Sequence, residues 1–353
     1  MTSTNWKKTV TNPAQLGGIE TSVLDNGPGR GSRIAWVNTG TGLRFKVVLD
    51  RAMDIVEAFF NEHSLAWLSH GGTTAAEPGL NRGIDWLRTF PGGLMTTCGL
   101  QSVGGPNGEG IHEHGLHGRI SNLPAELESV IQPDLLTGNL DFSITGRMRE
   151  SQVFGPSLEL KRTISGTLGE PTIRVHDTIT NRGNTPAPHM LLYHLNFGWP
   201  LVDEGTRILT NGNLQPRADD QSLAYYRDGI DYRTCPAPMD THSGYGEVCA
   251  FINPAADDAG WCYTGLHNER LGLAVSVRFR KEQLPWLSNW QHWGRGEYVT
   301  GLEPGTHPPI GQTKAREEGS LIFLQPGESR VYELEFAILR EAKAIDDFLN
   351  QFN

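Results

Sequence analysis

Strict alternation of apolar and polar residues is the feature that most limits how this chain can fold. Four stretches show it clearly: LRFKVVL (residues 43–49), LDFSIT (140–145), LGLAVSVRFR (271–280) and VYELEFAIL (331–339). Successive side chains of a β-strand point to opposite faces, so each stretch predicts a strand with one buried and one solvated side. Strands of that kind are typical of antiparallel sheets.

Turn sequences separate these strands, and glycine is abundant at 42 of 353 residues. The sequence therefore predicts an all-β fold built as a large antiparallel β-sandwich. Helical signal is weak: a short helix is expected at about 341–351, and another near 83–87. Without a repeat or linker, we expect a single domain over 1–353 with an N-terminal extension of about 1–30, two β domains being the alternative.

The charge balance restricts the partners. The formal net charge is −10 and no basic block occurs, which argues against nucleic acid and anionic membranes as partners. The first 18 residues contain no apolar signal region, and no run reaches the length of a membrane span. We therefore expect a cytoplasmic protein that binds small molecules. Cys249 and Cys262 could pair across a hairpin, but free buried thiols are favoured.

The stretch EGIHEHGLHGR (109–119) concentrates histidines and acids. His112, His114 and His117 could supply imidazole ligands to a metal ion, with Glu109 or Glu113 adding oxygen. A metal there would favour a metal-assisted sugar isomerase or epimerase. No distant partner of clear type accompanies the three histidines, so we expect neither a metal nor another cofactor.

Four segments combine aromatic, polar and glycine residues where strands should end. Aromatic rings can cover the C–H faces of a sugar while polar groups meet its hydroxyls, so this composition favours a sugar-binding pocket. The segments are DRAMDI (50–55), GIHEHGLHGR (110–119), LLYHLNFGWPLVDEG (191–205) and WLSNWQHWGRGEYVTGLEPGT (286–306).

The order of three motifs resembles the aldose 1-epimerase, or galactose mutarotase-like, superfamily. The motifs are GLHGR (115–119), the segment 172–201 that ends in LLYHLNFGWPL, and GLEPGT (301–306). DRAMDI, RISNLPAE (119–126) and LEPGT resemble its bacterial DUF4432-type branch, which includes sulfoquinovose mutarotase-like members. The resemblance spans roughly residues 40 to 340. It implies a β-supersandwich and a mutarotase that interconverts sugar anomers in carbohydrate catabolism.

The resemblance also implies catalytic roles for three residues. Opening an aldose ring needs a base for the anomeric O1 proton and an acid for the ring oxygen. By analogy with the family, Glu303 is the base and His194 is the acid. His117 would hydrogen-bond and polarise the ring oxygen or a nearby hydroxyl. An imidazole and a carboxylate can exchange one proton at neutral pH without a cofactor.

Further residues are candidates for binding the sugar: Arg51, Asp54, Arg88, His112, Asn196, Trp290 and Gln291. Arg51 and Asp54 could equally form a structural ion pair, and Arg88 could cap a loop. Arginines near the proposed pocket could accept a carboxylate, sulfonate or phosphate, so the sugar could be neutral or anionic. A non-catalytic sugar-binding protein is a third function that remains open. Homo-oligomerisation is also open, since strand edges in such sandwiches often need covering.

Overall fold

The computed structural model describes residues 6–109, 113–227 and 230–352. Its strands form three sheets, and each strand pair within them is antiparallel, which confirms the predicted fold class. We call them the first sheet, the long sheet and the site sheet. The first sheet has the order β1 (Gly18–Val23), β2 (Arg33–Asn38), β3 (Leu43–Val48), β4 (Asp54–Phe60), β5 (His63–Ser64).

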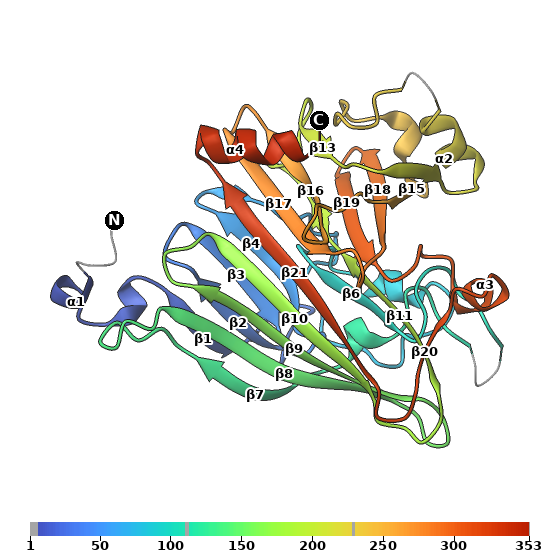
Figure 1. Ribbon diagram of the computed structural model, residues 1–353, viewed down its shortest axis with the longest axis horizontal. Coiled ribbons are helices and arrows are strands. Elements are labelled where there is room, and N and C mark those ends of the chain that lie inside the picture. Colours follow the sequence, from blue (N-terminus) through green and yellow to red (C-terminus); the bar gives the residue numbers. More distant parts are fainter. Residues whose placement is uncertain (1–5, 110–112, 228–229, 353) are drawn as a thin grey trace.

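The long sheet crosses the molecule diagonally in Figure 1. Successive residues of β8 and β21 alternate between buried and more exposed positions, as the period-two pattern of the sequence predicts. Its order is β13 (Arg207–Leu209), β16 (Trp261–Asn268), β17 (Leu273–Arg280), β21 (Ser329–Leu339), β10 (Thr172–Asn181), β9 (Ser157–Thr167), β8 (Asp141–Ser151), β7 (Glu126–Ile131).

The site sheet differs because two of its central strands, β11 and β19, are buried on both faces for most of their length. Its order is β14 (Asn213–Pro216), β15 (Val248–Asn253), β18 (Trp286–Gly294), β19 (Glu297–Gly305), β11 (Ala187–His194), β20 (Ile322–Leu324). β6 (Thr96–Leu100) also pairs with β11, and β12 (Asn196–Phe197) pairs with β19. A strand buried on both faces needs cover on each side, and that cover creates the cavity described below.

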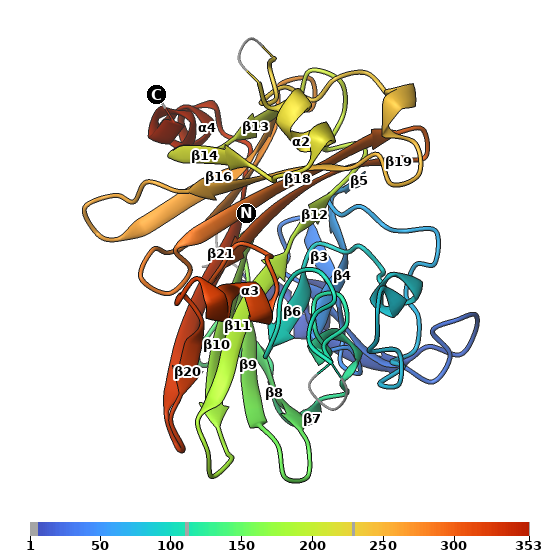
Figure 2. The same ribbon diagram turned by 90° about the vertical axis from the view of Figure 1, so that its right-hand side faces the viewer.

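Helices are short and lie outside the sheets, as Figures 1 and 2 show. In the described part of the chain, none is long and apolar enough to cross a membrane. The α-helices are α1 (Trp6–Thr9), α2 (Asp220–Tyr225), α3 (Gln312–Glu317) and α4 (Ala342–Leu349). The 3-10 helices are η2 (Pro13–Gln15), η3 (Asp85–Arg88), η5 (Ile120–Asn122), η6 (Asp240–His242) and η7 (Asn350–Phe352).

One hydrophobic core joins the three sheets. It includes Phe45 of the first sheet, Phe279 of the long sheet and Leu302 of the site sheet, all fully buried. The four cysteines are buried and free, as the sequence favoured. Burial of this apolar surface is the main favourable contribution to the stability of the fold.

The guanidinium group of Arg162 is fully buried next to this core. Arg162 on β9 lies opposite Asp177 on β10, and its Nη2 donates to Asp177 Oδ2 at 2.6 Å. Its Nη1 donates to Asp54 Oδ1 at 3.3 Å and to Thr97 Oγ1 at 2.8 Å. The Tyr193 hydroxyl donates to Asp177 at 2.7 Å. One charged group therefore ties together β9, β10, the start of β4, β6 and β11.

Replacing Asp177 by alanine should destabilise the protein strongly. The substitution leaves the Arg162 guanidinium buried with only the more distant Asp54 as counter-charge, and breaking a buried pair in this way costs about 3–5 kcal/mol. Urea unfolding measures the loss. The control is Glu170→Ala, which removes one of the two carboxylate partners of Arg174 from an exposed i,i+4 pair and should cost less than about 1 kcal/mol. Similar losses for both variants would contradict the central role of Arg162.

Candidate active site

Alternate residues at one end of the site sheet contribute to the floor of one cavity of about 540 Å³. The period of two puts side chains of the same parity on one face. β18 supplies Trp290 and His292, β19 supplies Val299 and Glu303, and β11 ends at His194. The sheet thus brings together residues more than 100 positions apart in the sequence.

Aromatic side chains wall the cavity. Trp86, in η3, stacks on Phe90 with a centroid distance of 4.2 Å, and the edge of Trp67 meets Trp290 at 6.2 Å. Trp67, Trp86 and Phe90 come from the segment between β5 and β7, which covers the site sheet. Exposed apolar side chains at Ile84, Leu87 and Tyr245 also line the cavity. Flat apolar rings around a polar floor suit the C–H faces of a sugar.

His194 and Glu303 form a buried pair at the centre of the polar floor. The Nε2 of His194 lies 3.2 Å from the Oε1 of Glu303, and the two residues are 5% and 2% exposed. Burial raises the pKa of Glu303 well above its usual value, and nearby Glu247 raises it further. Burial lowers the pKa of His194 well below its usual value. Both groups therefore favour their uncharged forms at neutral pH.

Gly301 makes room for this carboxylate. It lies two residues before Glu303 on β19 and opposite both Trp290 on β18 and Asn196 on β12. A Cβ at Gly301 would lie 2.5 Å from Oε1 of Glu303, closer than real Cβ atoms approach a neighbour. Because residue 301 is a glycine, no side chain separates the Glu303 carboxyl group from Trp290.

His117 enters the cavity from a tight turn. Its φ of 58° is left-handed, and the next residue, Gly118, packs so closely that a Cβ would lie 2.4 Å from the Gly99 carbonyl oxygen. The imidazole ring lies 5.5 Å from that of His194 and 4.8 Å from the ring of Trp86. Burial lowers the pKa of His117 to about 4, against the opposing effect of Glu247. His117 is therefore neutral at neutral pH.

Glu247 and Arg217 complete the polar lining. Trp290 Nε1 donates to Oε2 of Glu247 at 2.6 Å, and Arg217 Nη1 donates to Oε1 at 2.8 Å. Arg217 Nε also donates to Asp219 at 2.6 Å. Sequence reasoning missed Glu247 and Arg217, which lie just outside β15 and β14 and belong to no motif. It missed the wall residues Trp67, Trp86 and Phe90 as well.

His292 was also missed, although the sequence carries a signal for it. Counting in steps of two from Trp290 puts His292 on the same face, and it lines the cavity. The same count puts Gln291 and Trp293 on the opposite face, and neither lines the cavity. The Gln291 amide instead donates to the Tyr232 carbonyl and to Asn289.

Several predicted substrate-binding residues lie elsewhere. Arg51 is fully buried and donates to Asn122 at 3.0 Å, and Asp54 belongs to the buried Arg162 network. Arg88 is largely exposed and pairs with Asp85. Asn196 lies behind His194 and does not line the cavity. His112 lies outside the described residues.

Metal ligands were the alternative role for the histidine-rich stretch. Among residues 6–109, 113–227 and 230–352, no group of three or more His, Cys, Asp or Glu side chains could hold a metal ion. His117 lines the cavity, whereas the Nε2 of His114 lies 3.2 Å from the Gln312 amide. The third proposed ligand, His112, lies outside the described residues, so the structure places only two of the three histidines.

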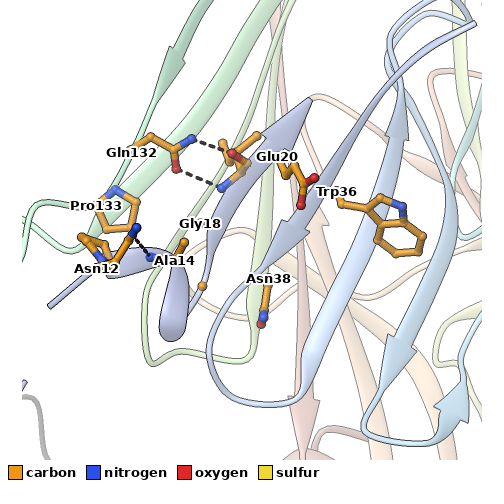
Figure 3. Close-up of a pocket in the computed structure, with 11 residues that line it drawn as sticks. Asn12, Ala14, Gly18, Glu20, Trp36, Asn38, Gln132 and Pro133 are labelled. Atoms are coloured by element: carbon orange, nitrogen blue, oxygen red, sulfur yellow. Dashed lines mark hydrogen bonds between the residues drawn. The ribbon is translucent and has the colours of Figure 1, made fainter. Parts of the chain in front are cut away.

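A second cavity, of about 370 Å³, lies where β1 and β2 meet residues 12–18 and 132–133, and Figure 3 shows it. It shares no lining residue with the first cavity. The Gln132 amide spans part of it by bonding both the N–H and the carbonyl of Ile19. Asn12 and Asn38 accept from nearby backbone N–H groups. The polar side chains here fasten the chain to the edge of the first sheet.

Comparisons with known proteins place these features in a wider group. Residues 29–338 match a family model described as a domain of unknown function, DUF4432. No curated protein matches the chain. A solved structure of a proposed aldose 1-epimerase from Klebsiella pneumoniae is 25% identical with a TM-score of 0.82, covering 95% of this chain and 86% of that one.

Two more distant structures share the fold. A galactose mutarotase-like protein from Clostridium acetobutylicum is 11% identical with a TM-score of 0.64, over 93% of this chain and 100% of that one. A galactose 1-epimerase from Lactobacillus acidophilus is 11% identical with a TM-score of 0.58, over 91% and 98%. These likenesses confirm the galactose mutarotase-like β-sandwich expected from the sequence.

The partly buried His117 should make folding stability sensitive to acid. Its folded pKa of about 4 lies below the ordinary value of 6.5, so below pH 6.5 the unfolded chain binds the proton first. Stability should therefore fall as the pH falls from about 6.5 to about 4. The full shift corresponds to about 3 kcal/mol, and we expect about 2 because one side of the ring faces the cavity.

The measurement is the free energy of unfolding in urea at a series of pH values. His117→Asn should reduce the acid-dependent loss by that amount, while the exposed-site control His176→Asn should leave the loss as in the wild type. Parallel pH profiles for the wild type and His117→Asn would show that the ring is not held neutral by burial.

Proposed function

The chain belongs to the DUF4432 family, and from that premise we propose that it is a sugar isomerase of the aldose 1-epimerase type, interconverting the anomers of a reducing sugar. The observation that carries the proposal is the buried pair of His194 and Glu303, 3.2 Å apart within an aromatic-walled cavity. The fold shared with a galactose 1-epimerase supports it. Function still has to be argued from the site, because one fold hosts many activities.

The pair can give and accept a proton at the same time. With the pKa of Glu303 raised and that of His194 lowered, the two groups together hold one proton at neutral pH. That proton sits either on the carboxyl, beside a neutral imidazole, or on the imidazole, beside a carboxylate. The two groups lie 3.2 Å apart, and Oε1 of Glu303 has no hydrogen-bond partner among the described residues, so it is free to meet a substrate hydroxyl. Anomerisation needs just such a pair, because each turnover moves one proton on and one proton off the sugar.

In the proposed mechanism the ion-pair form opens the ring. The Glu303 carboxylate takes the proton from the anomeric hydroxyl, and His194 Nε2 gives a proton to the ring oxygen as the C1–ring oxygen bond breaks. The open-chain aldehyde rotates about C1–C2 and presents its other face. The ring oxygen then attacks C1 and returns its proton to His194, and the new O1 takes the proton held by Glu303. Both residues end as they began, and no atom is gained or lost.

Other groups are placed to hold the sugar. The Trp290 ring can cover a C–H face, and Glu247, whose two oxygens each keep a free lone pair, can accept from hydroxyls. The neutral His117 can donate to or accept from the ring oxygen region. We assign the proton transfers to Glu303 and His194 because these two side chains lie 3.2 Å apart in the polar floor.

The charge of the lining favours a neutral sugar. Among the described residues that line the cavity, Arg217 is the only arginine or lysine, and Asp219 and Glu247 already pair with it. Glu247 and Glu297 also line the cavity and add acidic groups. A carboxylate, sulfonate or phosphate on the sugar would meet repulsion without a free cation to offset it. We therefore propose an uncharged aldose as the substrate.

Glu303→Gln and His194→Asn should each slow anomer exchange by about 100-fold or more, since each removes a group that moves a proton. Exchange is measured by NMR magnetisation transfer between α and β anomers over a panel of neutral aldoses and their 6-phosphates and 6-sulfonates. We expect acceleration among the neutral members. The glutamine variant keeps the shape of the site and changes only its proton chemistry.

Exposed residues provide the controls: Glu170→Gln and His176→Asn should exchange sugars at the wild-type rate. A chelator should leave the wild-type rate unchanged, whereas a metal-assisted isomerase would lose activity. If the wild type binds a sugar by calorimetry but accelerates exchange of none, the protein is a sugar-binding protein and the proposal is wrong. Unchanged rates in both site variants would mean that other residues carry the chemistry.

A further inference from the structure

The Asn196 side chain is fully buried, and its hydrogen bonds join it to Gly93 and His194. Its Nδ2 donates to the Gly93 carbonyl oxygen at 3.0 Å and to the His194 carbonyl oxygen at 2.9 Å. Its Oδ1 lies 2.6 Å from Nδ1 of the His194 ring. The sequence predicted a sugar contact at this position, but the side chain lies behind the histidine and away from the cavity lining.

These contacts decide which way the amide points. The two carbonyl oxygens can only accept hydrogen bonds, so the group that faces both of them must be the NH₂. Turning the amide over would bring its oxygen against two other oxygens. Oδ1 therefore faces the ring of His194, and the ring nitrogen opposite an acceptor must carry hydrogen. Nδ1 of His194 is the donor in this bond.

The remaining ring nitrogen is then fixed as well. When His194 is neutral, Nε2 has no hydrogen, and this unprotonated nitrogen lies 3.2 Å from Oε1 of Glu303. We propose that Asn196 is a positioning residue that holds His194 in the Nδ1–H tautomer, so that Nε2 is the only ring atom that exchanges protons with Glu303 and the substrate. The catalytic part of this inference rests on the proposed function, whereas the tautomer itself does not.

The backbone around Asn196 holds the amide in place. Its N–H donates to the Gly93 carbonyl at 3.2 Å, and its carbonyl accepts from the N–H of Trp67 at 2.9 Å. On β12 it pairs with Gly301 of β19, two residues before Glu303. The same short stretch of sheet therefore sets the positions of the amide, the imidazole and the acid relative to one another.

An amide suits this role better than a carboxylate would. A carboxylate behind a histidine stabilises the imidazolium and raises its pKa, as charge of opposite sign always does. An amide oxygen fixes the tautomer with only a partial charge. Burial can then keep the pKa of His194 low, so that the proton it receives from Glu303 is easily passed to the sugar.

The direct test is ¹⁵N NMR of the ligand-free protein with labelled histidine. Long-range ¹H–¹⁵N correlations distinguish a protonated from an unprotonated ring nitrogen, and the signals lost in His194→Asn assign His194. We expect Nδ1 to be protonated and Nε2 unprotonated near pH 7. A wild-type spectrum with the proton on Nε2 would overturn the inference without any variant.

Asn196→Leu removes the amide while keeping a similar size, and should shift His194 toward the Nε2–H tautomer. The matched control is Asn268→Leu. Asn268 is also buried and also donates to two carbonyl oxygens, those of Pro200 and Leu201, but it does not touch the cavity. Both variants should lose stability, and only Asn196→Leu should change the spectrum of His194. An unchanged Nδ1–H tautomer in that variant would also overturn the inference.

Kinetics then separate positioning from binding. In Asn196→Leu we expect kcat to fall by up to about 100-fold with little change in KM. Asn196→Asp keeps an acceptor and the tautomer, and its charge should move the acidic limb of the kcat/KM profile to higher pH by about one unit. If no sugar is turned over, the proposed function fails while the spectrum still decides the tautomer. If sugars are turned over and the tautomer is wrong, only the role of Asn196 fails.

Discussion

The ion pair between Arg162 and Asp177 is the interaction on which the arrangement of the three sheets depends. Both side chains are fully buried, and they oppose each other across β9 and β10. The network continues through Tyr193, whose hydroxyl bonds Asp177 and whose neighbour in the chain is His194. A buried charge tolerates few geometries, because any displacement leaves it without compensation. The network therefore also fixes the position of β11, the strand that ends at His194.

The fold could be predicted because its information is local. Alternation along β8, β17 and β21 indicates strands with one buried face, and the observed burial follows that period. The division into three sheets could not be predicted in the same way. It depends on pairings between distant segments, such as β10 with β21, which sequence periodicity does not specify. The burial of β11 and β19 on both faces could not be predicted either, because such strands show no alternation of apolar and polar residues.

Part of the candidate site was predictable, from family motifs and from the aromatic-rich segment that contains Trp290. His117, His194 and Glu303 lie in motifs that resemble a family, and all three line the same cavity. A motif alone was a poorer guide for charged residues: Arg51 and Asp54 lie within DRAMDI and carry polar groups suited to a sugar, yet tertiary packing directs them into the interior. Glu247 and Trp67 show the opposite case, since their role in the cavity arises only when loops fold over the sheet.

The missing side chain at Gly301 has a consequence for how relatives of this protein can vary. A carboxylate in the position of Glu303 and a Cβ two residues earlier compete for the same space. A homologue that keeps the acid and acquires a side chain at this position must turn the end of the acid away from where it lies here. A homologue without the acid is released from the constraint. The glycine therefore controls where the carboxyl group can lie, independently of the sugar.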